Sequence, residues 1–145
     1  MTELKRIAIF GSTGSIGTQA LEVIAANTDK FSAEILTAHT NETLLIQQAL
    51  QFNPNVVVIG DESKYLKVKE ALSQTGIKVF AGEKALEETA AMNCYDLMLA
   101  GIVGYAGLIP TLQAIENGKP VALANKETLV VAGDIIMQKA IEKRV

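Results

Sequence analysis

The fold of this chain is decided near its start by the stretch Gly11-Ser12-Thr13-Gly14-Ser15-Ile16-Gly17. Its glycines are spaced three and three, which is a variant of the dinucleotide-binding fingerprint. In that fingerprint one glycine permits a tight turn, the second lets the backbone approach a pyrophosphate, and the third lets a helix pack closely on a strand. The stretch predicts a strand, a phosphate loop and a helix in that order. The alternative is a glycine-rich turn without a ligand, with Ser15 as the N-cap of the helix.

Apolar segments bounded by turn residues recur along the rest of the chain, as in strand-helix units of a parallel sheet. The predicted strands lie at residues 4–10, 33–38, 55–60, 77–80, 95–100 and 120–124. Two intervening helices carry an apolar stripe, formed by Ile16, Ala20, Val23 and Ile24 in the first and by Leu129, Gly133, Ile136, Met137 and Ala140 in the last. We therefore predict an α/β fold, a single Rossmann-like domain over residues 1–145 with a doubly wound, mainly parallel sheet.

The composition narrows the range of partners. Sixteen acidic and 13 basic residues give a net charge of -3, and no Lys/Arg stripe is present, so we do not expect nucleic acid binding. The single cysteine, Cys94, cannot form an internal disulfide, which is typical of a cytoplasmic protein. No signal-peptide core and no apolar run of roughly 20 residues is found, so we do not expect membrane association.

The segment after the second predicted strand bears on the choice of nucleotide. Sites that prefer NAD place an acid there, whereas this chain has Thr37-Ala38-His39-Thr40-Asn41, and the first carboxylate is Glu42. NADP is favoured because no carboxylate repels a 2′-phosphate. The segment contains no Arg or Lys, so the donors are left to Thr40, Asn41, backbone N–H groups and His39. Catalysis by His39 is disfavoured, because no carboxylate is near it in the sequence, and its contact with a cofactor stays open.

Three polar residues, Asn125-Lys126-Glu127, follow the last predicted strand at the same sheet edge as the glycine loop. In a purely structural interpretation Asn125 caps the next helix and Glu127 favours the helix dipole. Lys126 opposes that dipole, which suggests that it meets an anion or a polar substrate. The residue types alone leave these two interpretations equal.

Together, three segments resemble the 1-deoxy-D-xylulose 5-phosphate reductoisomerase family: the glycine loop at 11–17, Ile102-Val103-Gly104-Tyr105-Ala106-Gly107-Leu108, and Leu123-Ala124-Asn125-Lys126-Glu127. The resemblance extends over essentially all 145 residues. It implies conversion of 1-deoxy-D-xylulose 5-phosphate to 2-C-methyl-D-erythritol 4-phosphate in non-mevalonate isoprenoid synthesis. It also implies NADPH as the cofactor, a divalent metal (Mg or Mn) in the full-length enzyme, a phosphosugar substrate and a homodimer.

Carried over by position, the resemblance implies roles for individual residues. The pyrophosphate would be held by Thr13, Gly14, Ser15 and Ile16, and the 2′-phosphate would be surrounded by His39, Thr40 and Asn41. Asn125 and Glu127 would contact the nicotinamide end, Lys126 would reach the substrate, and residues 100–102 would border the adenosine. In one departure, relatives carry Gly-Lys-Asn where this chain has His39-Thr40-Asn41, so a phosphate partner is missing.

The family's acidic metal site belongs to an Asp-Ser-Glu-His segment that would follow residue 145. We therefore expect no catalytic residue and no metal site within these 145 residues, which would bind cofactor without turnover. One alternative is a fragment of another NAD(P)-dependent reductase or a nucleotide-sugar epimerase, whose Tyr-x-x-x-Lys pair could be Tyr65 and Lys69. Those residues lie early in the chain, on a predicted third helix among charged residues. The other alternative is a stand-alone redox-sensing or nucleotide-sensing module.

Overall fold

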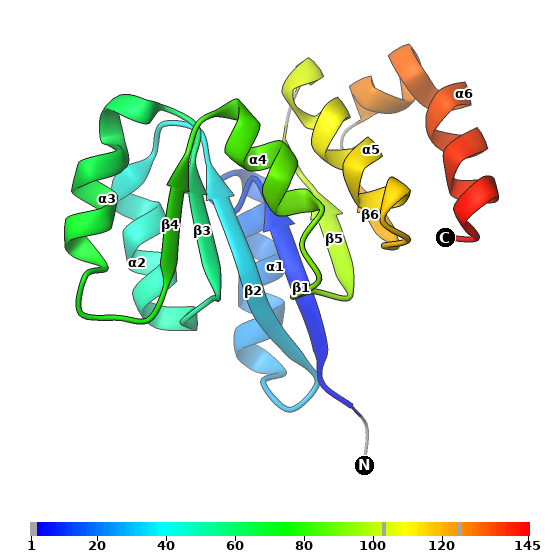
Figure 1. Cartoon of the computed structure of the whole chain (residues 1–145). Helices are drawn as coiled ribbons and strands as arrows, with labels where there is room; N and C mark the ends of the chain where they lie inside the picture. The colour runs from blue at the N-terminus through cyan, green and yellow to red at the C-terminus, as the bar shows by residue number, and fades with distance from the viewer. Residues whose placement is uncertain (1–2, 103, 125) are drawn as a thin grey trace.

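A computed structural model describes residues 3–102, 104–124 and 126–145, with the side chains of 104, 105 and 126–132 left out of the description. Strands and helices alternate along the chain (Figure 1). Their order is β1 (Lys5–Phe10), α1 (Ser15–Ala26), β2 (Phe31–Ala38), α2 (Glu42–Phe52), β3 (Val56–Ile59), the 3-10 turn η1 (Glu62–Lys64), α3 (Tyr65–Ala71), β4 (Lys78–Ala81), α4 (Glu83–Ala90), β5 (Leu97–Ala100), the 3-10 turn η2 (Gly104–Gly107), α5 (Leu108–Glu116), β6 (Val121–Leu123) and α6 (Lys126–Lys143). Every predicted strand is present, and each of its ends lies within two residues of the prediction.

Six strands of the described chain form one sheet in the order β4-β3-β2-β1-β5-β6, and every neighbouring pair is parallel. The predicted doubly wound parallel sheet is therefore confirmed. From β1 the chain builds outward through β2, β3 and β4, then returns to the other side of β1 to add β5 and β6. The direction of winding reverses between β1 and β5, which makes this the switch point of the sheet.

Each sheet face is covered by its own set of helices (Figure 1). Ile7 and Ile9 of β1 belong to a buried cluster that includes residues of α1, α2 and α3. The alternate residues Ala8 and Phe10 belong to a second cluster, with residues of α4 and α5. Successive side chains of a strand point to opposite faces, so an almost fully apolar strand is what two covered faces require.

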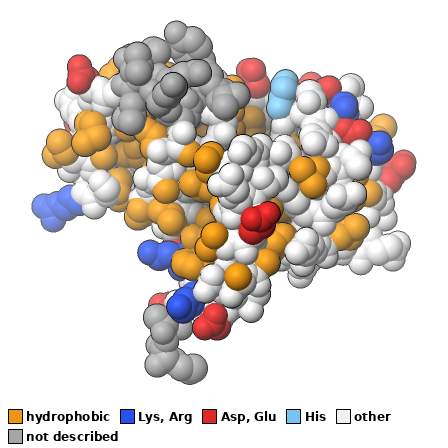
Figure 2. Space-filling model, turned by 180° about the vertical axis from the view of Figure 1, so that it is seen from behind, with side chains coloured by type: hydrophobic (Ala, Val, Ile, Leu, Met, Phe, Trp, Pro, Cys, Tyr) orange, Lys and Arg blue, Asp and Glu red, His pale blue; other side chains and the backbone are white. Residues whose placement is uncertain are grey.

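The packing face of α1 differs from the predicted stripe. Gly17, Leu21 and Ile24 are buried, whereas Ile16 and Val23 are 45% and 54% exposed, so the prediction was wrong for these last two residues. The reason is that Gly17 lies directly against the backbone of the preceding loop. This contact sets the rotation of α1 about its axis, so that Ile16 and Val23 face solvent. From behind, where α1 and α2 cover the sheet, Figure 2 shows apolar side chains on the surface among few charged ones.

The predicted stripe of α6 is also only partly correct. Ile136 is buried against Ile115 of α5, and Gly133 and Ala140 are half-buried, but Met137 is 55% exposed. The side chain of the remaining stripe residue, Leu129, lies outside the described residues. The reason is that α6 packs mainly on α5 and not on the sheet. A single helix covers a narrower side of α6 than a sheet would. Among the described residues, no helix combines the length and apolar character needed to cross a bilayer.

An ion pair connects two neighbouring strands at their amino ends, away from the glycine loop. Arg6 donates from Nη2 to Asp96 Oδ1 at 2.9 Å and from Nε to Oδ2 at 3.2 Å. The Arg6 backbone N–H donates to Oδ2 as well, at 2.9 Å. These hydrogen bonds lower the pKa of Asp96 to about 2. The pair therefore joins the residue just before β5 to β1.

Candidate functional site

The loops after β1 and β5 meet at the switch point of the sheet. The backbone N–H of Gly101 donates to the Phe10 carbonyl oxygen at 2.8 Å. Gly11 has a φ of +94°, and a Cβ there would lie 2.9 Å from the carbonyl carbon of Gly101. Both the backbone conformation and this close approach require glycine at position 11. Beyond this point the loops separate, which opens the crevice where parallel α/β sheets bind ligands.

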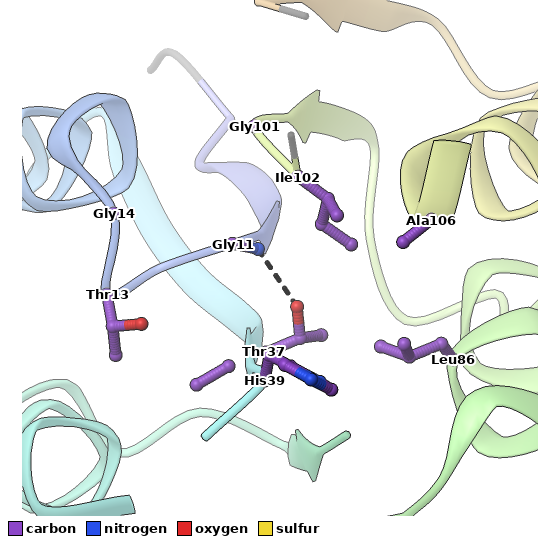
Figure 3. Close-up of a pocket in the computed structure, with 10 residues that line it drawn as sticks. Gly11, Thr13, Gly14, Thr37, His39, Leu86, Gly101, Ile102 and Ala106 are labelled. Atoms are coloured by element: carbon purple, nitrogen blue, oxygen red, sulfur yellow. Dashed lines mark hydrogen bonds between the residues drawn. The ribbon is translucent and has the colours of Figure 1, made fainter. Parts of the chain in front are cut away.

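A cavity of about 300 Å³ occupies this crevice, and Figure 3 shows the residues that line it. This volume lies at the lower end of the usual range for small-molecule pockets, roughly 300–1,000 Å³. The lining residues come from the ends of β1, β2 and β5 and from α4 and η2: Gly11, Thr13, Gly14, Thr37, Ala38, His39, Leu86, Gly101, Ile102 and Ala106. The structure thus brings the predicted site residues Thr13, Gly14 and His39 to one cavity, with two residues of the predicted segment 100–102. Ser15, Ile16, Thr40 and Asn41 are exposed residues beside it.

The start of α1 is open toward an anion. The helix begins at Ser15, and its N-cap is Gly14, so Ser15 is not the N-cap that the alternative of a ligand-free turn assumed. Gly14 has no side chain that could cap the helix, and the first amides of a helix have no carbonyl one turn earlier to accept their hydrogen bonds. These N–H groups and the positive end of the helix dipole favour a negatively charged ligand.

A buried polar network fixes the glycine loop, and sequence reasoning missed it. Ser12, Thr37 and Gln48 are all less than 7% exposed. Gln48 donates from Nε2 to the Ser12 carbonyl oxygen at 2.9 Å, and its Oε1 lies 2.7 Å from the Ser12 hydroxyl. The Thr37 hydroxyl accepts from the Gly11 N–H at 2.9 Å, a bond drawn in Figure 3. A polar residue within the buried stripe of α2, beside Leu45, was the signal that could have revealed it.

His39 follows the end of β2 and packs against the next strand. A Cβ on Gly60 would lie 2.7 Å from His39 Nδ1, so this glycine makes room for the imidazole. The His39 carbonyl oxygen accepts from the Asp61 N–H at 2.8 Å, which ties the ends of β2 and β3 together. The imidazole is held at the rim of the cavity, a position suited to contact with a ligand.

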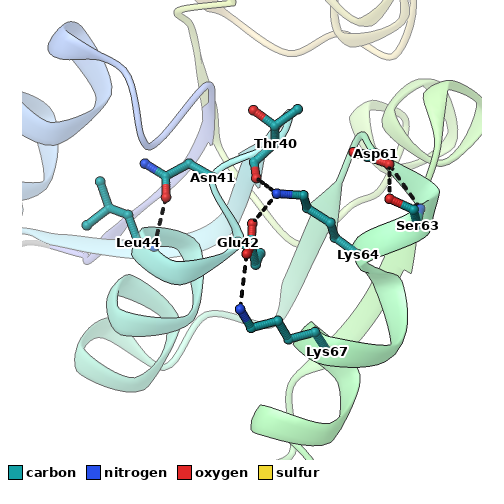
Figure 4. Close-up of polar contacts among 8 residues, drawn as sticks. All are labelled: Thr40, Asn41, Glu42, Leu44, Asp61, Ser63, Lys64 and Lys67. Carbon is teal, nitrogen blue, oxygen red and sulfur yellow. Dashed lines mark hydrogen bonds and ion pairs between the residues drawn. The ribbon is translucent and has the colours of Figure 1, made fainter.

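Asn41 caps α2, and the carboxylate of Glu42 is paired with two lysines (Figure 4). Asn41 Oδ1 accepts from the Leu44 N–H at 3.2 Å, as an N-cap does. Glu42 is ion-paired with Lys64 at 2.7 Å and with Lys67 at 3.1 Å. The hydrogen bond from Lys64 is the main reason that the pKa of Glu42 is lowered to about 2. The first carboxylate after the predicted 2′-phosphate segment is therefore ionised but paired, by lysines that sequence reasoning did not connect with this loop.

The remaining predicted residues are placed only in part. Ala124 donates its N–H to the Ala100 carbonyl oxygen at 3.0 Å, so the end of β6 lies beside that of β5. Asn125 lies outside the described residues. Lys126 and Glu127 form the start of α6, and their side chains lie outside the description.

The Tyr-x-x-x-Lys alternative does not meet the cavity. On α3, Lys69 Nζ lies 3.1 Å from the Tyr65 hydroxyl at an exposed position, and neither residue lines the crevice. The described residues also contain no group of three or more His, Cys, Asp or Glu that could hold a metal ion.

Parallel strands that lead through a glycine loop to an uncapped helix start, beside a cavity at the switch point, are typical of Rossmann-class dinucleotide-binding domains. Within that class, the chain belongs to the 1-deoxy-D-xylulose 5-phosphate reductoisomerase family, whose model matches residues 7–133.

Individual relatives agree with this assignment. The chain is 55% identical over 132 residues to the reductoisomerase of Phocaeicola vulgatus and 49% identical over 141 residues to that of Porphyromonas gingivalis. These alignments cover 91% and 97% of this chain but only 35% and 37% of the relatives. The solved structure of the Zymomonas mobilis reductoisomerase in complex with NADPH has a TM-score of 0.93 and 41% identity, over 97% of this chain and 37% of that one. The chain therefore spans little more than a third of the length of these relatives.

Proposed function

We propose that residues 1–145 form a single domain that binds NADPH for a 1-deoxy-D-xylulose 5-phosphate reductoisomerase. The observation that carries this proposal is the cavity between the loops after β1 and β5, at the uncapped start of α1. It is supported by the family assignment and by two similar solved structures described as complexes with NADPH. When bound, NADPH supplies a hydride, and this domain binds and orients it.

The pyrophosphate fits the loop that Thr13, Gly14, Ser15 and Ile16 form. A Cβ on Gly14 would have one atom within 4 Å, the Gly11 carbonyl oxygen at 3.7 Å, so the loop presents an open backbone surface there. The cavity wall of Leu86, Ile102 and Ala106 is apolar and suits the flat face of an adenine, with residues 100–102 at the adenosine. His39, Thr40 and Asn41 surround the 2′-phosphate in this arrangement.

The other roles follow from the family. We assign Asn125 and Glu127 to the nicotinamide end of the cofactor and Lys126 to the substrate. In the whole protein the substrate is the phosphosugar 1-deoxy-D-xylulose 5-phosphate, and the product is 2-C-methyl-D-erythritol 4-phosphate. A similar solved structure is described as a complex with NADPH, fosmidomycin and magnesium. As part of the same proposal, we place the Mg or Mn site, and with it turnover, in the part of the relatives that this chain does not cover. A cytoplasmic homodimer is part of the same proposal.

Calorimetric titration of the chain with NADPH and NADH, side by side, tests the proposal. We expect NADPH to bind more tightly than NADH. A Gly14→Val variant should lose most of this affinity, because its side chain fills the open surface of the loop. Its melting temperature should stay close to that of the unmodified chain, since the nearest atom to the new Cβ is 3.7 Å away. Equal, weak responses to both cofactors, or unaltered binding by Gly14→Val, would contradict the proposal.

A further inference from the structure

Lys64, outside every segment singled out in the sequence, lies at the loop after β2 (Figure 4). It is the last residue of η1, and its Nζ donates to the Thr40 carbonyl oxygen at 2.9 Å. The same ammonium donates to Glu42 Oε2 at 2.7 Å. A lysine from the loop after β3 thus reaches the segment where the sequence contains no basic residue but a histidine.

The position of Lys64 is set by the turn that carries it. Asp61 Oδ1 accepts from the Ser63 N–H at 3.0 Å and from its hydroxyl at 2.6 Å, which shapes η1. The Asp61 N–H donates to the His39 carbonyl oxygen, and the Lys64 N–H donates to the Asp61 carbonyl oxygen at 3.0 Å. The turn after β3 is therefore attached to the turn after β2. The side chain of Lys64 is 34% exposed, against 64% for Lys67.

The charges around Thr40 leave a cationic donor available. An ammonium has three N–H groups, and the structure uses two of those on Lys64, for Thr40 and Glu42. Glu42 is shared with Lys67, so one carboxylate faces two ammonium groups. Asp61, which lines a second cavity beside His39 together with Glu62 and Glu83, is engaged by Ser63. A third N–H on Lys64, with its positive charge, can therefore meet an anion at Thr40.

We propose that Lys64 is the cation that recognises the 2′-phosphate in this chain. This rests on the proposed function, since the 2′-phosphate is the group that distinguishes NADPH from NADH. In Rossmann domains the loop after the second strand meets the 2′ position of the ribose, and a basic residue accommodates a phosphate there. Lysine binds phosphate as a point charge, so it can act from a neighbouring loop as well as from the segment itself. Lys64 supplies, through tertiary structure, the charge that residues 37–41 lack.

The test compares Lys64→Gln with Lys67→Gln by calorimetric titration with NADPH and with NADH. Both variants remove one positive charge from the environment of Glu42, but only Lys64 contacts Thr40. We expect Lys64→Gln to weaken NADPH about tenfold, the value of roughly one charge-assisted hydrogen bond, and to leave NADH unchanged. Lys67→Gln should change either affinity less than about twofold, in line with an exposed ion pair.

A double variant separates direct contact from simple neutralisation of Glu42. If Lys64 binds the phosphate itself, Lys64→Gln combined with Glu42→Gln should still bind NADPH weakly. Recovery of wild-type affinity in the double variant would overturn the direct contact. A Lys64→Gln variant that keeps the wild-type preference for NADPH would overturn the proposed role of Lys64 but not the proposed function of the domain. Failure of the unmodified chain to bind either cofactor would overturn the proposed function instead.

Discussion

Replacement of Gly17 by alanine tests the physical basis of the glycine loop most directly. A Cβ at this position would overlap the Gly11 carbonyl oxygen and would lie 2.6 Å from Ser12 Cα and 2.8 Å from its carbonyl carbon. All three atoms belong to backbone, so no side chain can rotate away. Ordinary contact begins near 3.4 Å, so α1 and the loop must separate by at least about 0.8 Å from Ser12 Cα alone.

The size of the effect follows from two opposing terms. Overpacking of a close-packed site costs roughly 1–3 kcal/mol, and a clash among backbone atoms belongs at the upper end of that range. Alanine in place of glycine within a helix returns about 1 kcal/mol. We therefore expect Gly17→Ala to lower the free energy of unfolding by about 2 kcal/mol, or the melting temperature by roughly 4–8 °C. NADPH affinity should also fall, because the amides at the start of α1 move with the helix.

Urea unfolding followed by circular dichroism measures this change, and Gly133→Ala is the matched control. Gly133 is also a helical glycine, in α6, but a Cβ there meets nothing within 4 Å. The control should gain up to about 1 kcal/mol from helix propensity. If Gly17→Ala proves as stable as the unmodified chain, or gains like the control, the close approach of α1 to the loop is refuted.

Three further changes test the buried contacts and the ion pair. Gln48→Leu should cost about 2 kcal/mol in urea unfolding and weaken NADPH binding, because it removes the hydrogen bond that the buried Ser12 carbonyl oxygen accepts from Gln48; unchanged values would contradict the network. Tyr95→Phe should cost about 1 kcal/mol, since the buried hydroxyl donates to the Ala90 carbonyl oxygen at 2.6 Å; no loss would count against that bond. Asp96 has a folded pKa of about 2 against an ordinary 3.8, so its ion pair with Arg6 contributes stability above the ordinary pKa that is lost as pH falls toward 2. Asp96→Asn should flatten acid unfolding in this window, and an unaltered profile would argue against the pair.

The strands and the glycine loop could be predicted from sequence because their causes are local. A continuous β-branched apolar run such as Val56-Val57-Val58-Ile59 is typical of a strand that is covered on both faces. The loop at 11–17 is dictated by backbone conformations that only glycine adopts readily, as the φ of +94° at Gly11 shows. The exposure of Ile16 could not be predicted, because apolar periodicity does not report that Gly17 must face the loop, where only a residue without a side chain fits.

The sequence by itself determined a parallel sheet, a glycine loop after its first strand, and the absence of a repelling acid in residues 37–41. Only the tertiary structure decided what stabilises and completes that site. Gln48, 36 residues from Ser12, holds the loop, and Lys64, 24 residues from Thr40, supplies its charge. The physical reason is that spacing along the chain reports which residues share a helix or a strand. Which side chains from different loops converge at one edge depends on strand order and packing, and these are set by the whole sheet.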